Sequence, residues 1–391
     1  MGRGHVTVTS TDREELTASD VRRALEAVLG TPFTDGNAIR RYRNGDEIFP
    51  PMLQAIAQAR ETVEFLTFIY WTGDVAEAFA DALSQRARAG VKVRVLLDAY
   101  GAMKISSDLT REMEAAGVEV RWFRPLTQWR IWKHDNRTHR KVMVVDGRIA
   151  FTGGVGIAAE WEGDARDPSE WRDTHYRIEG PAVKGLQGAF WGNWMEVENT
   201  VGDAVHEVRD LAPVGSAAVQ VVRSTASIGW SDVALLFDAL ISLARKRILI
   251  VTAYFAPDPD NAAHLRRAAR RGVDVQVMIP GDHIDKRISE LSTSNEFAGL
   301  IEDGVRICRY QRTMLHVKLV LIDDAVACIG SANFNQRSMR QDDEVVLVVL
   351  DRELVAQLER DSLEDLEDCE ALDAAKWRRR GLLRRCAEAA A

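Results

Sequence analysis

Two histidine–lysine pairs combine residue types that could act on a phosphate ester. His139 and Lys141 precede the apolar run 142–145, and His316 and Lys318 open a similar run. An apolar run that ends in Asp-Gly is typical of a strand entering a tight turn. Because side chains of a strand alternate between its two faces, residues two apart project the same way. Each pair therefore predicts an imidazole and an ammonium side by side at the mouth of a buried strand.

The second pair is a repeat of the first. The same 177 residues separate His139 from His316 and Gly153 from Gly330, so residues 139–154 align without a gap on 316–331. Segments 59–74, 88–98 and 115–123 likewise match 243–258, 270–280 and 302–310. A single His-x-Lys is weak evidence, because such a histidine is usually a surface or satisfied core residue. A duplication that served packing alone need retain only apolar positions, yet this one also retains the polar ones.

Two matching strand mouths that face each other would bring two histidines and two lysines into one cleft. One histidine could attack phosphorus and form a covalent intermediate. The other could protonate the leaving alkoxide and later deprotonate the incoming alcohol or water. The lysines would offset charge on the nonbridging oxygens, so this chemistry calls for no metal and no cofactor.

Each pair is followed by residues suited to phosphate contact. Glycine permits close approach of the backbone to a phosphate, and a hydroxyl or an amide can donate to its oxygens. The expected phosphate-binding residues are Gly153, Gly154, Gly330, Ser331 and Asn333. Asp146 and Asp323 lie seven residues after their histidines, an odd step that places them on the opposite strand face. We interpret both aspartates as turn-forming residues that support the site, not as acids or bases.

The elements around the pairs predict an α/β fold. Each half reads as helices alternating with apolar strands, two of which follow Gly-Val, and ends in the His-Lys hairpin. This pattern predicts two pseudo-symmetric α/β sandwich lobes with mixed, mainly parallel sheets flanked by helices. The expected divisions are a peripheral segment (1–35), a first lobe (36–205), a second lobe (206–365) and a basic C-terminal helix or tail (366–391).

Composition narrows the class of protein. The chain has 391 residues, 46% hydrophobic and 28% charged, with a formal net charge of −8. The negative charge disfavours a protein that coats nucleic acid. Its four cysteines lack the spacing of metal ligands, and we expect them to be reduced thiols in a reducing compartment. We find neither a signal peptide nor 18 uninterrupted apolar residues, and therefore expect a cytoplasmic protein without a transmembrane helix.

The residues 136–147 (NRTHRKVMVVDG) and 316–338 resemble the phospholipase D superfamily, whose signature is a duplicated H-x-K-x4-D with a glycine-containing tail. The segments NGDEIFPPMLQAIAQARETVEFLTFIYWTGD and EWRDTHYRIEGPAV resemble its bacterial cardiolipin synthase branch. The resemblance implies the phospholipase D-like fold and a ping-pong mechanism through a phosphohistidine. It makes His139 the nucleophile and His316 the general acid/base.

The resemblance also implies a downstream carboxylate in each half that orients the histidine of that half. Asp173 and Glu344 occupy these places. Without the family pattern, each would read as a solvated charge on a strand edge. Two positions depart from the pattern, because Gly156 stands where the family usually has Asn and Asp342 replaces another Asn. Only Asn333 could then supply the amide that the family has at this position, and Asp342 would add negative charge near the cleft.

Two segments are candidate membrane contacts, and a third is a candidate lid. Residues 121–141 interleave basic and aromatic side chains, which suits an anionic lipid surface. The same mixture could bind single-stranded nucleic acid, or its tryptophans could form a buried aromatic cluster. The C-terminal segment 374–391 could lie on an acidic membrane as a basic amphipathic helix or dock on the protein. The acidic segment 160–171 could be a lid or a solvated loop.

These features favour a phosphatidyltransferase at the inner face of the membrane that converts two phosphatidylglycerols to cardiolipin and glycerol, or performs a close variant. A hydrolytic phospholipase D that releases phosphatidic acid is the main alternative, because water and alcohol compete for the same intermediate. A nuclease is disfavoured by the negative charge. A binding scaffold without activity is disfavoured by the intact His-Lys pairs. An anionic phospholipid is the expected partner, nucleic acid is not, and the oligomeric state is open.

Overall fold

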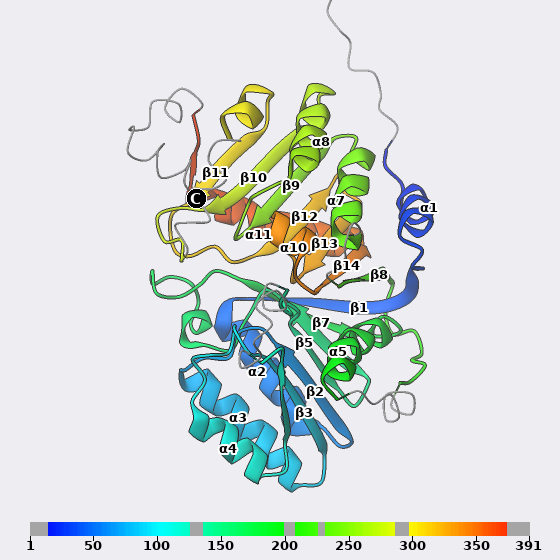
Figure 1. The fold of residues 1–391 in the computed structure, drawn as a ribbon. Coiled ribbons are helices and arrows are strands. Elements are labelled where there is room, and N and C mark those ends of the chain that lie inside the picture. Colours follow the sequence, from blue (N-terminus) through cyan, green and yellow to red (C-terminus); the bar gives the residue numbers. More distant parts are fainter. Residues whose placement is uncertain (1–14, 126–135, 199–207, 226–230, 286–296, 374–391) are drawn as a thin grey trace, which may run out of the picture.

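The strands of both halves join in one mixed sheet. The computed structural model describes residues 15–125, 136–198, 208–225, 231–285 and 297–373 (Figure 1). The strands of the first half are β1 (Thr34–Arg43), β2 (Thr62–Thr67), β3 (Lys92–Asp98), β4 (Glu119–Phe123), β5 (Val142–Val145), β6 (Ile149–Gly153) and β7 (Thr174–Glu179). Those of the second half are β8 (Ala217–Ser224), β9 (Arg247–Thr252), β10 (Asp274–Pro280), β11 (Arg306–Tyr310), β12 (Lys318–Ile322), β13 (Val326–Gly330), β14 (Glu344–Leu350) and β15 (Cys369–Ala371).

The order of the strands displays the duplication. Within the described residues the sheet has 15 strands in the order β15-β11-β10-β9-β12-β13-β14-β8-β1-β7-β6-β5-β2-β3-β4. The antiparallel pair β1–β8 joins the halves, and outward from it β7, β6, β5, β2, β3 and β4 mirror β14, β13, β12, β9, β10 and β11. The predicted α/β class is confirmed. The sheet is not mainly parallel, however, because only β2–β3–β4 and β9–β10–β11 pair in parallel among the described strands.

Helices cover both faces of the sheet. They are α1 (Ala18–Leu29), α2 (Asn44–Gln58), α3 (Asp74–Arg88), α4 (Ser107–Ala115), the 3-10 turn η2 (Ala159–Trp161), α5 (Val183–Glu198), α7 (Asp232–Leu243), α8 (Pro259–Arg270), α10 (Gln336–Arg340) and α11 (Arg352–Glu367). In Figure 1, α3 and α4 lie on the lower half and α7 and α8 on the upper half, with β1 running across the boundary. No helix within the described ranges is long and apolar enough to cross a membrane.

One hydrophobic core is shared between the halves. It combines Val142 and Val144 of β5 with Leu319 and Leu321 of β12, and side chains of α5 and α11 complete it. These strands carry the two His-Lys pairs at their entrances. Burial of apolar surface is the main favourable term in folding, so this shared core fixes the two entrances relative to each other.

The N-terminal segment is more integrated than the expected peripheral segment 1–35. Thr17 precedes α1 and forms a capping box with Asp20, which satisfies the backbone N–H groups of these two residues. Val21 and Leu25, four residues apart on one face of α1, are fully buried against the core of the second half. Residues 16–33 are therefore part of that lobe, because the apolar stripe of α1 needs a partner.

Asp146 and Asp323 occupy equivalent turns. Both have φ close to +50°, in the left-handed region that Asp tolerates better than most residues. The Asp146 carboxylate accepts hydrogen bonds from the N–H groups of residues 60–62 at the start of β2. The Asp323 carboxylate accepts the same three bonds from residues 245–247 before β9. Each aspartate thus fastens its hairpin to the neighbouring strand, at the end away from the histidine.

We predict that Asp323→Ala lowers the free energy of unfolding by about 1–3 kcal/mol, because three N–H groups lose their acceptor. Asp323→Asn should recover part of this loss through its remaining oxygen. Chemical denaturation measures the effect. Asp324→Ala is the matched control, since Asp324 makes only an exposed ion pair with Arg247, worth about 0–1 kcal/mol. Equal losses for Asp323→Ala and Asp324→Ala would contradict the bracing role.

Candidate active site

His139 is held by a strand of the opposite half. Its backbone N–H donates to the carbonyl oxygen of Asp343 at 2.9 Å, in a short parallel bridge between Thr138 and Asp343. Its Nδ1 lies 2.9 Å from Oε1 of Glu344, the first residue of β14. The nucleophile expected in the first half is therefore oriented by a carboxylate of the second.

His316 makes the reciprocal contacts. Its backbone N–H donates to the carbonyl oxygen of Arg172 at 2.7 Å, and its Nδ1 lies 2.7 Å from Oδ2 of Asp173. Our expectation that each carboxylate orients the histidine of its own half is therefore wrong. The two carboxylates are exchanged across the boundary, because the segments that carry them pair in parallel with the opposite His-Lys segment.

The exchange fixes the tautomers of both histidines. Asp173 and Glu344 are fully buried. Burial alone would raise the pKa of each carboxyl group, but the neighbouring histidine and lysine lower it overall. Burial lowers the pKa of His139 to about 4 and that of His316 to about 3. A neutral imidazole that donates Nδ1–H to a carboxylate keeps its Nε2 lone pair for chemistry.

Both lysines bind back to their histidines. The Nζ of Lys141 donates to the carbonyl oxygen of His139 at 2.8 Å, and that of Lys318 to the carbonyl oxygen of His316. Lys318 Nζ also lies 3.2 Å from Nε2 of His316. Burial lowers the pKa of Lys141 to about 7 and that of Lys318 to about 8. Because burial removes water from both ammonium groups, binding of an anion beside them is favourable.

The carboxylates are supported differently in the two halves. The Ser331 hydroxyl donates to Oε2 of Glu344. Gly154 holds the equivalent place in the first half, where a Cβ would lie 2.3 Å from Oδ1 of Asp173. The indole Nε1 of Trp161 donates to Asp173 instead, at 2.9 Å. Glycine at 154 is thus required by the carboxylate.

The expected phosphate donors divide into two groups. Ser331 and Gly154 serve the carboxylates, and Gly153 and Gly330 pack closely on the neighbouring strands, so these four support the site from behind. Asn333 lies in the pocket described below, where its buried Oδ1 has no hydrogen-bond partner. Asn333 is therefore the tail residue positioned for a ligand. At Gly156, a Cβ would lie 2.6 Å from Ile69 Cβ, which explains why no Asn stands there.

A polar pocket of about 370 Å³ opens beside His139. Both halves line it, with Phe68, Tyr100, Arg137, His139, Tyr254, Asn333, Asn335, Arg337, Ser338 and Asp342. Asp342 accepts from the N–H of Arg137 at 3.2 Å and from Nε of Arg337 at 2.9 Å. Burial raises the pKa of Asp342 to about 7, and the charge of Glu344 adds to this. The extra acid expected near the cleft therefore lines this pocket.

Aromatic rings that the sequence analysis did not select pack against both histidines. The Phe68 ring meets that of His139 at a centroid distance of 5.1 Å. Trp161 and Trp171 meet His316, each at 5.2 Å. These tryptophans lie near the two ends of the acidic segment 160–171, so those ends belong to the site. In the sequence, the one indication that these tryptophans belong to the site is their position shortly after the first glycine-containing tail.

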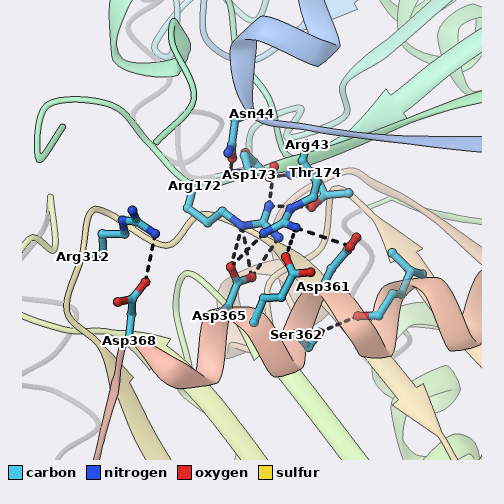
Figure 2. Close-up of polar contacts among 12 residues, drawn as sticks. Arg43, Asn44, Arg172, Asp173, Thr174, Arg312, Asp361, Ser362, Asp365 and Asp368 are labelled. Atoms are coloured by element: carbon cyan, nitrogen blue, oxygen red, sulfur yellow. Dashed lines mark hydrogen bonds and ion pairs between the residues drawn. The ribbon is translucent and has the colours of Figure 1, made fainter. Parts of the chain in front are cut away.

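An ion-pair cluster holds the Asp173 segment against α11. The Arg172 guanidinium donates to both oxygens of Asp365, at 3.0 and 3.1 Å, and to the carbonyl oxygen of Asp173 at 2.7 Å. Arg43 adds contacts to Asp361 and Asp365 from β1 (Figure 2). Because Arg172 also accepts from the His316 N–H through its carbonyl, this cluster fixes Asp173 and His316 together.

The expected membrane-contact segments are only partly visible. Residues 126–135 of segment 121–141, with Trp129 and Trp132, lie outside the described residues, as does all of 374–391. In the described part Phe123 is fully buried, and Arg121 and Arg124 pair with Glu198 and Glu196 of α5. Arg137 and Arg140 are buried and bonded within the protein. The described arginines of this segment are thus bonded within the protein, and Lys141 belongs to the site.

Comparison with known proteins agrees with this geometry. Residues 52–160 and 237–365 match the family described as "Cardiolipin synthase, PLD-like domain". Cardiolipin synthase 1 of Bacillus cereus is 32% identical over 368 residues, covering 92% of this chain and 72% of that protein. Cardiolipin synthase A of Pseudomonas putida is 33% identical over 353 residues, covering 90% and 73%. Phosphatidylserine synthase of Haemophilus influenzae superposes with a TM-score of 0.71 at 14% identity, covering 90% and 92%.

The fold and the paired site define an enzyme of the phospholipase D superfamily. Within it, the chain belongs to the cardiolipin synthase family, whose phospholipase D-like domain occurs twice here. It is accordingly a phospholipid transferase of the cardiolipin synthase type.

The lysine pKa values predict how anion binding depends on pH. A lysine binds an anion in its charged form, and that form is lost as the pH rises through about 7 for Lys141 and about 8 for Lys318. Affinity for sulfate, which stays doubly charged, should therefore fall several-fold between roughly pH 6 and 9. Isothermal titration calorimetry measures it. Lys318→Met should weaken binding. Lys246→Met should not, because Lys246 precedes the first residue of β9, whereas Lys318 pairs with Thr252, the last residue of that strand. A constant affinity across this range would contradict the lysine assignment.

Proposed function

We propose that this enzyme transfers a phosphatidyl group from one phosphatidylglycerol to another and forms cardiolipin and glycerol. The observation that carries the proposal is the pair of histidines, each oriented by a buried carboxylate of the other half, with His139 lining the polar pocket. The choice of substrate rests on the relatives named cardiolipin synthase, which align over about 90% of the chain. Because its substrate lies in a bilayer, we place the enzyme at the membrane surface.

In the first step, Nε2 of His139 attacks phosphorus and the bond from phosphorus to the headgroup oxygen breaks. His316 gives its Nε2 proton to that oxygen, and glycerol leaves. The bound phosphodiester places a negative charge beside His316 and so raises the pKa of this imidazole from its low value in the empty site. Lys141 and Lys318 offset the charge that grows on the nonbridging oxygens.

In the second step, the headgroup hydroxyl of another phosphatidylglycerol gives its proton to His316. Its oxygen bonds to phosphorus, the N–P bond breaks and His139 is neutral again. Asp173 and Glu344 retain the tautomers throughout, so each Nε2 returns to its starting state. The reaction needs no net proton, because the one released to glycerol is regained from the acceptor.

Two contacts favour His139 as the nucleophile. Its side chain lines the pocket and is 12% exposed, which leaves Nε2 accessible to phosphorus. The Lys318 ammonium lies 3.0 Å from Nδ1 and 3.2 Å from Nε2 of His316, and this nearby positive charge makes the His316 imidazole a weaker nucleophile. Proximity to an exchangeable proton suits an acid/base instead.

Mass spectrometry of the products tests the proposal. Purified enzyme mixed with phosphatidylglycerol vesicles should yield cardiolipin and glycerol in equal amounts. His316→Ala should reduce the rate by about 10²–10⁴-fold, the usual contribution of a general acid/base. Phosphatidic acid as the sole product would show that water resolves the intermediate and would overturn the transferase assignment in favour of hydrolysis. Full activity of His316→Ala would contradict the two-histidine mechanism.

A further inference from the structure

A second groove continues from the polar pocket and has a different character. It encloses about 390 Å³ and shares Phe68 and Tyr100 with the pocket as a common wall. Its other lining residues are the apolar Ile69, Trp71, Met103 and Trp171, and Gly101, Lys104, Glu160 and Asp285. Small-molecule sites commonly enclose about 300–1,000 Å³ and are mainly apolar. The groove thus has the size and lining of a ligand site, and the proposed reaction has not used it.

The outer rim of the groove exposes apolar side chains to solvent. It is formed by residues 99–105, the loop between β3 and α4, in which Tyr100 is 52% exposed and Met103 is 58% exposed. These are two of the five exposed large hydrophobic residues in the described parts of the chain, and the other three are Val28, Val214 and Leu363. The Nζ of Lys104 lies 3.7 Å from the centre of the Trp71 ring. An aromatic ring, a methionine and a lysine thus share one edge.

The rim loop is fixed to the catalytic segment. Asp98 accepts from the N–H groups of Tyr100 and Gly101, at 2.9 and 3.0 Å, and also binds the guanidinium of Arg137, two residues before His139. The Nε1 of Trp71 donates to the carbonyl oxygen of Gly101 at 2.7 Å. Any Cβ at Gly101 would lie 2.1 Å from the carbonyl oxygen of Phe68. These bonds therefore hold the exposed rim at a fixed distance from His139.

We propose that the loop 99–105 inserts at the surface of a lipid bilayer and that the groove takes the diacylglycerol part of the phospholipid whose phosphodiester occupies the polar pocket. This inference rests on the proposed function. Phe68 contacts the His139 ring and also walls the groove, so a lipid with phosphorus at His139 leads its uncharged end past Phe68. Aromatic residues and lysines at the depth of the headgroups suit a membrane interface. The Tyr254 hydroxyl, on the wall of the polar pocket, donates to the Asp285 carboxylate at 2.7 and 2.9 Å, so Asp285 lies between the pocket and the groove.

Vesicle sedimentation with phosphatidylglycerol vesicles tests the surface. Met103→Asp should weaken binding at least about tenfold, because it replaces an inserting apolar side chain by a charge. Val214→Asp is the matched control, since Val214 is 60% exposed, lies on the connection before β8 and should leave binding unchanged. Lys104→Ala should cost about fivefold, the share of one lysine at an anionic surface, and the loss should shrink in high salt. Equal binding by Met103→Asp and Val214→Asp would overturn the inference.

A second substrate separates this inference from the proposed function. We expect Met103→Asp to lose much more activity on vesicles than on short-chain phosphatidylglycerol dissolved as monomers. If the wild type makes cardiolipin from neither form, the proposed function fails, whatever the variants bind. Suppose instead that the wild type is active, and that Met103→Asp loses its activity on vesicles and on monomers equally while still binding vesicles. Met103 would then affect only the active site, and the membrane role would be overturned.

Discussion

The site depends on two hydrogen bonds that cross the boundary between the halves of the chain. His139 is bonded to Glu344 and His316 to Asp173, so neither half holds a complete set of reactive groups. A buried carboxylate that loses a charged or hydrogen-bonding partner is costly, and each of these carboxylates reaches its histidine only when the halves are joined. The same pairing selects the tautomer in which Nε2 is free. The contacts that cross the boundary between the halves therefore also orient the two histidines.

The rest of the structure keeps these two bonds in register. The antiparallel pair β1–β8 makes one sheet of both halves, and a core shared by β5 and β12 fixes the strands that carry the histidines. Arg172 ties the Asp173 segment to α11, and Arg140 reaches from beside His139 to the carbonyl oxygens of Glu344 and Ser224. These arginines are buried and multiply bonded, as expected of charges that orient a site.

Sequence patterns predicted what is local or repeated, and missed what depends on packing over long separations. The 177-residue repeat gave the equivalent strands, and the spacing of Asp146 gave a turn, because both follow from neighbouring residues. The exchange of carboxylates joins residues 205 and 143 positions apart, which no periodicity encodes. Glu344 accepts a hydrogen bond from Ser331, whereas Asp173 accepts one from Trp161, and this difference depends on which side chain fits beside each carboxylate. The mainly antiparallel sheet and the burial of α1 likewise emerge only from the assembled fold.

The exchange of the two carboxylates is tested most directly by pre-steady-state kinetics with phosphatidyl-p-nitrophenol, whose leaving group needs no general acid. Asp173→Asn disturbs His316 alone, so it should release about one equivalent of nitrophenolate per site in a burst and then stall with the phosphohistidine formed. Glu344→Gln disturbs His139 and should show no burst. Glu196→Gln, which alters an acid of the exposed pair with Arg124, should turn over normally. A burst with Glu344→Gln and none with Asp173→Asn would mean either that each carboxylate serves its own half or that His316 is the nucleophile, and would contradict the account.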